Sequence, residues 1–105
     1  MKEITEKTAL VLTVVPINTA DVAQAPTAFR YRVDDLASGD EIRDWTTVSP
    51  SASMTITLDA TDNAIQYDRN GKETRVVTME ATHAGGLLTD DYIFRVRNLR
   101  FYPAA

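Results

Sequence analysis

The chain contains no cysteine among its 105 residues. Disulfide bonds, thiolate zinc sites, iron–sulfur clusters and cysteine nucleophiles are therefore excluded, and packing alone must hold the fold. Glycine and proline are scarce, with four of each, which argues against a fibrous or disordered chain. A chain of this length has room for one two-layer core. We therefore treat residues 1–105 as one domain and residues 1–7 as a candidate flexible N-terminal arm.

Long apolar runs are also missing. The run Ala9–Val15 is short, rich in β-branched residues and closed by Pro16. It falls well below the roughly 20 apolar residues of a membrane span and lacks the basic start and cleavage site of a signal peptide. The net charge of −4 argues against nonspecific binding of nucleic acid. We expect a protein made in the cytoplasm without a signal peptide, with neither a membrane nor nucleic acid as a partner.

What the chain does contain is alternation of apolar and polar residues, which is typical of strands with one buried face. Six segments have this period-two pattern: residues 8–15, 28–34, 41–48, 53–59, 74–81 and 91–99. The last two are the arms of a long hairpin with a turn at His83–Gly86. No window has a convincing helical stripe. The pattern predicts an all-β protein, a single antiparallel β-sandwich of about seven strands.

Two segments depart from simple alternation. Ile42 and Trp45 are three positions apart in one strand, which predicts a β-bulge between them and places Trp45 in the core. Residues 60–71 are less regular. Ala60–Ile65 has the composition of a short helical turn, and Asn70–Gly71 is a two-residue turn signal that predicts a small extra hairpin over residues 67–74.

The sequence has little on which to build catalysis. His83 is the only histidine, and it lies in a predicted turn, where a solvated side chain is expected rather than a member of a triad. The four serines lie in turn-like segments without a nucleophile-elbow motif. Gly85–Gly86 is not a phosphate loop, because neither a lysine nor a helix start follows it. We therefore expect no catalytic residue, no cofactor and no enzymatic activity.

Carboxylates gather in several predicted loops. The clusters are Asp34–Asp35, Asp40–Glu41, Asp59 with Asp62, and Asp90–Asp91. Oxygen ligands that converge at one end of a sandwich can hold calcium. However, no loop has the regular ligand spacing of a calcium motif, and turns favour Asp and Asn for conformational reasons. Solvated loop charges are the favoured interpretation, and no metal is expected. Asp90 and Asp91 are the first pair to test.

Arginines stand out on a chain that is acidic in total. Arg30, Arg32, Arg95 and Arg97 occupy predicted outward positions on two strands, with Arg75 and Arg100 nearby. If these strands share a sheet, the side chains form an arginine-rich stripe. Two interpretations stay open. The arginines pair with neighbouring acids, which contributes little stability on a surface, or they dock an acidic partner, since arginine is favoured in interfaces.

Some apolar residues lie outside the predicted strands. Leu87 and Leu88 fall at the predicted hairpin tip, and Phe101 and Tyr102 follow the last strand. They either close the core or anchor a partner. The candidate partner-binding residues are therefore Arg30, Arg32, Arg95, Arg97, Leu87, Leu88, Phe101 and Tyr102.

Several segments are similar to a known architecture. Arg75–Leu99 resembles the final hairpin of immunoglobulin-like and fibronectin type III-like modules, and Pro26–Val33 with Ile42–Trp45 resembles their second and third strands. Ser53–Leu58 resembles the strand that follows. Taken together, Pro26–Leu99 is similar to small accessory proteins encoded among the virion genes of tailed bacteriophages. The chain has no cysteine pair flanking Trp45, which rules out an antibody-type disulfide domain.

This resemblance implies an immunoglobulin-like, non-enzymatic structural protein located in the virion. It implies a capsid decoration protein or a neck or tail accessory protein that binds other virion subunits. A homo-oligomer on the particle is left open. The alternative is a carbohydrate- or calcium-binding β-sandwich that acts as an adhesion module.

Overall fold

A computed structural model of the chain describes residues 2–17, 20, 22, 24–67 and 69–98. These residues contain seven strands and no helix, which confirms the all-β prediction. The strands are β1 (Lys2–Thr5), β2 (Leu10–Val14), β3 (Ala28–Asp35), β4 (Glu41–Val48), β5 (Met54–Leu58), β6 (Lys72–His83) and β7 (Gly86–Arg97). Strands β2 to β7 correspond to the six predicted segments, and β1 was not predicted.

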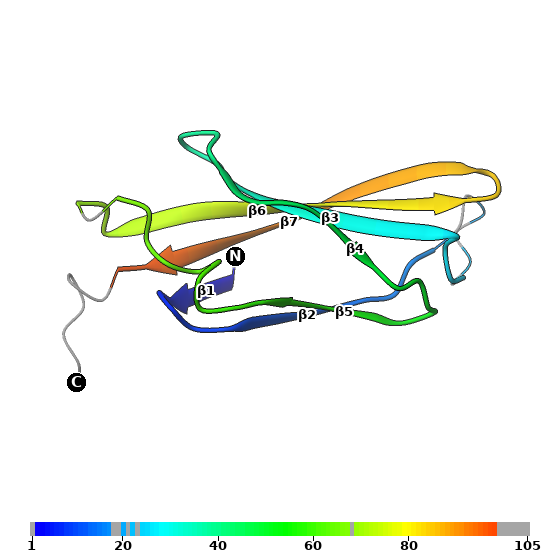
Figure 1. The fold of residues 1–105 in the computed structure, drawn as a ribbon, viewed down its shortest axis with the longest axis horizontal. Coiled ribbons are helices and arrows are strands. Elements are labelled where there is room, and N and C mark those ends of the chain that lie inside the picture. The colour runs from blue at the N-terminus through cyan, green and yellow to red at the C-terminus, as the bar shows by residue number, and fades with distance from the viewer. Residues whose placement is uncertain (1, 18–19, 21, 23, 68, 99–105) are drawn as a thin grey trace.

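The strands form two sheets that lie one above the other (Figure 1). The larger sheet has the order β1-β7-β6-β3-β4, and the smaller one consists of β2 and β5. All pairs are antiparallel except β1 with β7, so the larger sheet is mixed and the fully antiparallel prediction is wrong for β1. After β1 the chain crosses to the other sheet and forms β2, so β1 is not part of a hairpin. Its partner in the larger sheet is β7, which is distant in the sequence and can therefore run parallel to it. Lys2–Thr5 therefore form a paired strand and not a flexible arm.

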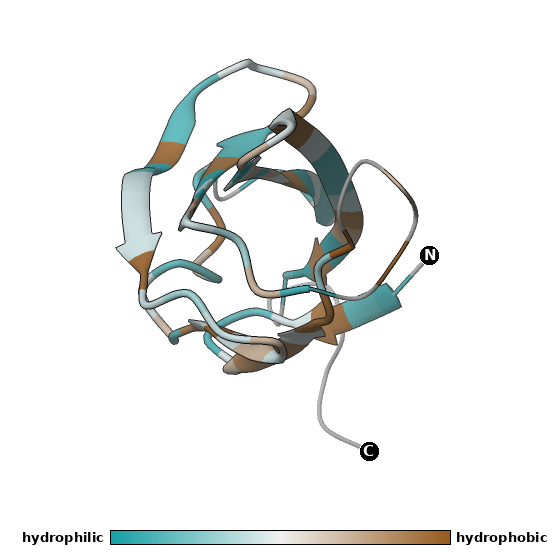
Figure 2. Ribbon diagram, turned by 90° about the vertical axis from the view of Figure 1, so that its right-hand side faces the viewer, coloured by the Kyte–Doolittle hydropathy of each residue, from teal (hydrophilic) through white to brown (hydrophobic). Residues whose placement is uncertain are grey.

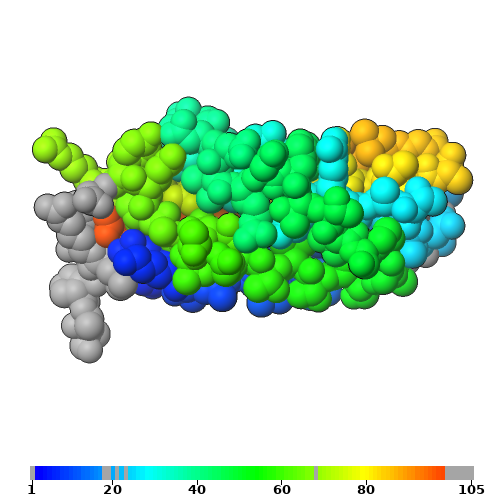
Figure 3. Space-filling view, viewed as in Figure 1, coloured from blue at the N-terminus to red at the C-terminus, as the bar shows by residue number. Residues whose placement is uncertain are grey.

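The molecule is elongated, with extents of 48 × 27 × 20 Å. The long axis follows β6 and β7, and the tip of their hairpin forms one end (Figure 3). Strands β6 and β7 have 12 residues each, whereas β2 and β5 have 5 each. At about 3.3 Å per residue the smaller sheet is less than half as long as the hairpin. It therefore covers only part of the larger sheet.

One hydrophobic core lies between the sheets. Viewed along the long axis, the strands surround a common interior (Figure 2). Alternate residues of β3, β5 and β6 point into it, as period-two geometry requires. The predicted inward sets of two strands are confirmed as buried: Phe29, Tyr31 and Val33 of β3, and Met54, Ile56 and Leu58 of β5. Val77, Phe94 and Val96 contribute from the hairpin.

The register of β3 with β4 confirms the predicted bulge. Tyr31 pairs with Thr46 and Val33 with Arg43, so β3 advances by two residues while β4 advances by three. A second shift follows, because Val33 pairs with Arg43 and Asp34 with Glu41. Each extra residue reverses the face of the side chains that follow, so the two shifts cancel, and residues three positions apart lie on opposite faces. Ile42 therefore packs against the core, whereas Trp45 lies on the outer face, half-buried, and its prediction as a core residue is wrong.

The last hairpin is longer than predicted. Strand β6 ends at His83, which pairs with Gly86, the first residue of β7, so only Ala84 and Gly85 form the turn. Gly86 has φ of 138°, a value that favours glycine. Leu87 and Leu88 are consequently strand residues and not a loop tip. His83 is buried rather than solvated, and its Nε2 has no hydrogen-bond partner in the described part of the chain.

The segment that connects β5 to β6 agrees with one prediction and differs from the other. Ala60–Ile65 contains a turn in which the Asn63 N–H donates to the Asp59 carbonyl, four residues before it, at 3.2 Å, as in the predicted single helical turn. The predicted extra hairpin at Asn70–Gly71 is absent from the described residues of this segment. Its polar groups instead gather around the carboxylate of Glu73.

Candidate interaction surfaces

The four predicted arginines all belong to the larger sheet, but they do not form one stripe. Arg30 and Arg32 lie on β3, whereas Arg95 and Arg97 lie on β7, and β6 separates the two strands. Arg32 is opposite Thr78 of β6, and Arg95 is opposite Thr74, so the two groups also lie at different positions along the strands. The structure therefore brings the arginines together as two separate pairs.

The first pair stacks on Trp45. The guanidinium carbon of Arg30 lies 4.0 Å from the ring centroid of Trp45, and that of Arg32 lies 5.7 Å from it. We call Arg30, Arg32 and Trp45 the Arg–Trp surface. Cation–π contacts of this kind contribute about 0.5–1 kcal/mol at exposed sites and hold flexible side chains in place.

Acidic residues neutralise the charge of the Arg–Trp surface. Arg30 pairs with Glu80 across the strands. Arg32 donates to both oxygens of Asp34 at 2.9 and 2.7 Å and lies 3.7 Å from Glu41. The hydrogen bond to Asp34 is the main reason that the pKa of Arg32 is raised. Two guanidinium groups thus meet three carboxylates, so this surface does not select an acidic partner by net charge.

The second pair lies beside the unpredicted strand β1. The carboxylate of Glu3 is 3.6 Å from Arg95, 3.3 Å from Arg97 and 3.7 Å from Lys72. Arg97 also donates to the hydroxyl of Thr5 at 3.1 Å. Three cations surround a single carboxylate, so this edge is basic. Here the arginines hold the N-terminal strand in place, an interaction that could not be anticipated without β1.

The apolar residues predicted to bind a partner lie in different environments. The side chain of Leu87 points outward, and 55% of the residue is exposed. Leu88 points to the opposite face and lines a groove between the two sheets. Phe101 and Tyr102 lie outside the described residues, as does Arg100. Only Leu87 therefore remains an exposed apolar anchor of the predicted kind.

Arg75 departs most from its predicted place near the outward arginines. It is fully buried at the end of the sandwich where the chain passes from β5 to β6. Its guanidinium pairs with Glu73 and with Asp35, the latter at 3.3 Å, and donates to the carbonyl oxygens of Asp62 and Ala64 at 3.0 Å each. These bonds satisfy a buried charge that would otherwise be strongly destabilising.

Glu73 is the carboxylate at the centre of this network. It accepts hydrogen bonds from the backbone of Gln66 at 2.8 Å and of Tyr67 at 3.0 Å, and from the side chain of Asn70 at 2.8 Å. Burial acts to raise the pKa of Glu73 and is the largest influence on it. The donated hydrogen bonds together with Arg75 outweigh burial, so the pKa of Glu73 is lowered.

The other predicted carboxylate clusters are also held by donors. Asp62 accepts a bidentate interaction from Arg43 at 2.9 and 2.8 Å. Asp40 accepts a hydrogen bond from the hydroxyl of Tyr67 at 2.7 Å, which is the main reason its pKa is lowered. Among the described residues no three His, Asp or Glu side chains are grouped so that they could hold a metal ion. Asp90 and Asp91 lie within β7 and not in an end loop.

Comparisons with known proteins found no matching family model, no matching curated protein and no matching solved structure. The described part of the chain also contains no helix with the length and apolar character needed to cross a membrane. The interpretation of function therefore depends on the surfaces described above.

Proposed function

We propose that this protein is a non-enzymatic interaction module of a tailed-phage virion, either a capsid decoration or a neck or tail accessory protein. The observation that carries the interaction role is the Arg–Trp surface. Tryptophan and arginine are the residues most enriched among those that dominate binding energy at interfaces. Here they are stacked on one another on the outer face of a sheet, where folding of the core does not require them.

We further propose that the sandwich is immunoglobulin-like. In that fold the second and fifth strands share one sheet, and the third, sixth and seventh share the other, with an added strand beside the third in variable-type domains. The sheet β2-β5 and the run β7-β6-β3-β4 fit this arrangement strand by strand. The virion assignment itself is supported by the sequence resemblance, in which such modules bind other virion subunits.

The decisive experiment is co-sedimentation with assembled particles. The protein is expressed together with the capsid and tail proteins encoded beside it, and particles are separated on a density gradient. We expect the native chain to travel with the particles. The double variant R30E/W45A should bind at least about tenfold more weakly, because it removes both a charge and an aromatic anchor. R69E, an exposed arginine away from this surface, is the matched control.

Trp45→Ala is suitable for this test because Trp45 is outside the core. We expect a loss of about 1–2 kcal/mol in the free energy of unfolding, from the cation–π contacts and partial burial, rather than the 3–5 kcal/mol of a core tryptophan. Failure of the native chain to co-sediment would overturn the proposal. Trp45-dependent binding on a glycan array, or a thermal shift with calcium, would instead favour the adhesion module.

A further inference from the structure

Within the described part of the chain, the edge of β7 away from β6 has no paired strand over most of its length. Strand β1 covers only Phe94–Arg97, and no other described strand pairs with β7 on the side away from β6. In a two-residue hairpin the residues flanking the turn form a hydrogen-bonded pair, and such pairs then alternate along the ladder. His83 with Gly86 is that first pair. The backbone groups of Leu87, Thr89 and Asp91 therefore point to the open edge.

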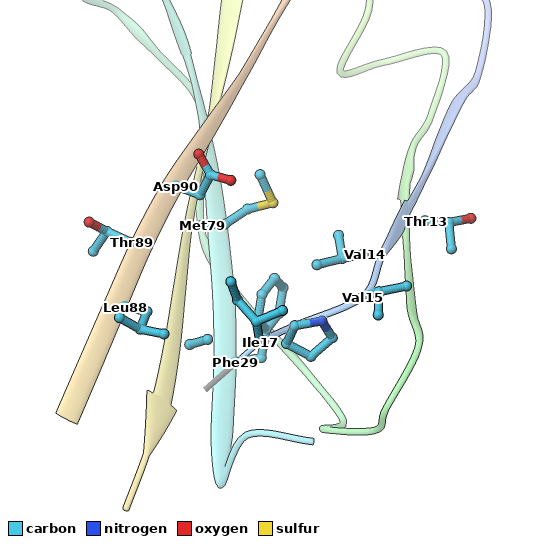
Figure 4. A pocket seen from close by; sticks show the side chains of 11 residues that line it. Thr13, Val14, Val15, Ile17, Phe29, Met79, Leu88, Thr89 and Asp90 are labelled. Carbon is cyan, nitrogen blue, oxygen red and sulfur yellow. The ribbon is translucent and has the colours of Figure 1, made fainter. Parts of the chain in front are cut away.

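A groove of about 410 Å³ lies beside this edge, between the two sheets. Figure 4 shows Leu88 and Met79 on one side and Val14 on the other, with Phe29 and Ile17 between them. The groove exists because β2 ends at Val14, while the hairpin continues beyond it. It is mostly apolar, and Asp90 lies at its rim.

Asp90 lies near the middle of the open part of the β7 edge. Its carboxylate accepts a hydrogen bond from the backbone N–H of Asp91 at 2.8 Å, the group that would otherwise donate across the edge. Neither Asp90 nor Asp91 has an ion-pair partner among the described residues. A charged side chain at a sheet edge disfavours pairing with another strand. A basic residue on the added strand would neutralise the charge of Asp90 and so permit pairing.

We propose that this groove and edge bind an extended segment of another protein, which adds to β7 as a further strand. Its backbone pairs with Leu87, Thr89 and Asp91. On the face that enters the groove, an apolar side chain lies opposite Leu88 and a lysine or arginine lies opposite Asp90. Main-chain pairing supplies affinity in such strand addition, and the alternating side chains supply specificity. The site is separate from the Arg–Trp surface and does not depend on it.

A second copy of this chain is a poor occupant. Antiparallel pairing of two β7 edges about a two-fold axis at Asp90 or at Asp91 places that aspartate opposite the same residue of the other copy, and an axis at Thr89 places each Asp90 opposite Leu88. Like charges directly opposite one another destabilise a strand pair. The same carboxylates attract a basic segment, so charge favours a different, basic protein as the partner.

The test uses a hexapeptide with blocked ends and the sequence Val-Lys-Lys-Thr-Val-Val, titrated into the full chain and followed by amide chemical shifts. In antiparallel register it places lysines opposite Asp91 and Asp90 and valine opposite Leu88. We expect shifts at Leu87, Thr89 and Asp91, and none at Arg30 or Trp45. The reversed peptide establishes whether the added strand is antiparallel or parallel.

Charge exchange provides the control. The variant D90K/D91K should weaken binding of the lysine peptide at least about tenfold and create binding of a peptide with glutamates in place of the lysines. The variant E41K/D44K makes the same change of charge on β4 and should leave binding unaltered. Equal binding of the lysine and glutamate peptides by the native chain overturns the proposal. So does the absence of shifts at the β7 edge, or a dimer of the native chain that buries this edge.

Discussion

The two ends of the sandwich solve the same packing problem in opposite ways. At one end, which we call the sealed end, the inward positions of β6 are Glu73 and Arg75, and both charges are buried with partners. At the other, the open end, Met79 and Ala81 are inward positions that are apolar and line a groove, and the last inward position is the buried His83. A buried charge must be fully paired, whereas an apolar side chain needs only to be packed against other residues. At the sealed end the charges are paired, and at the open end the apolar side chains are only partly covered by the second sheet.

The sealed end contributes to the stability of the fold, and the open end is available for binding. A buried ion pair often stabilises a protein no more than apolar residues of the same volume would. Removing one partner of the pair nevertheless lowers the free energy of unfolding strongly, because the other charge stays buried. The sealed end orders the chain between β5 and β6 around Glu73 and Arg75. The open end, with its short second sheet, keeps apolar and main-chain groups available for a partner.

The largest expected effect is at the sealed end. Arg75→Ala leaves Glu73 and Asp35 buried without their cation, so we expect a loss of about 3–5 kcal/mol in the free energy of unfolding, measured by urea denaturation. Arg95→Ala removes a partly exposed arginine and should cost less than about 1 kcal/mol. Similar losses for the two variants would show that the sealed end is not held by this network.

A matched pair of leucines compares the ends directly. Leu58 is fully buried beside the sealed end, and its replacement by alanine should cost about 2–5 kcal/mol. Leu88 lies at the open groove, and Leu88→Ala should cost about 1 kcal/mol or less, because little cover is lost. Thermal unfolding of both variants gives the comparison. A large loss for Leu88→Ala would mean that the groove is closed in solution.

The smallest effect is a dependence on pH that belongs to the sealed end. The pKa of Glu73 is lowered from its ordinary value of 4.5. Its stabilising contribution is therefore fully present above the pKa of the unfolded chain and is lost as the pH falls through the lower folded pKa. Glu73→Gln should flatten the acid side of the stability profile, measured by urea denaturation at a series of pH values, whereas Leu88→Ala should leave its shape unchanged. An unaltered acid limb in Glu73→Gln would contradict this role.

Much of the fold was predictable because alternation reports directly on which face is buried. Phe29, Tyr31 and Val33, and likewise Met54, Ile56 and Leu58, follow the rule without exception. The irregularity of β4 was predicted from the spacing of Ile42 and Trp45, but on a wrong premise, because Ile42 packs against the core and Trp45 does not. Strand β1 was missed because four residues with one apolar side chain, Ile4, have too little pattern to distinguish a strand from a polar arm.

The surfaces were harder to predict than the strands. Alternation alone places Arg75 inward with Val77, yet a charged residue is expected outward, and only Glu73 and Asp35 explain its burial. Leu87 and Leu88 looked like a loop because two glycines precede them, but the ladder with β6 continues to the turn. In both cases the deciding partner lies on another strand.

Residue types and their local period were sufficient to predict the all-β class, the positions of six strands and the absence of disulfide bonds. These properties follow from patterns that act within one strand. The parallel pairing of β1, the burial of Arg75, the division of the arginines into two groups, and the open edge of β7 with its groove are set by contacts between strands. Each of these depends on which strands become neighbours and how far each sheet extends, and such contacts join residues far apart in the chain.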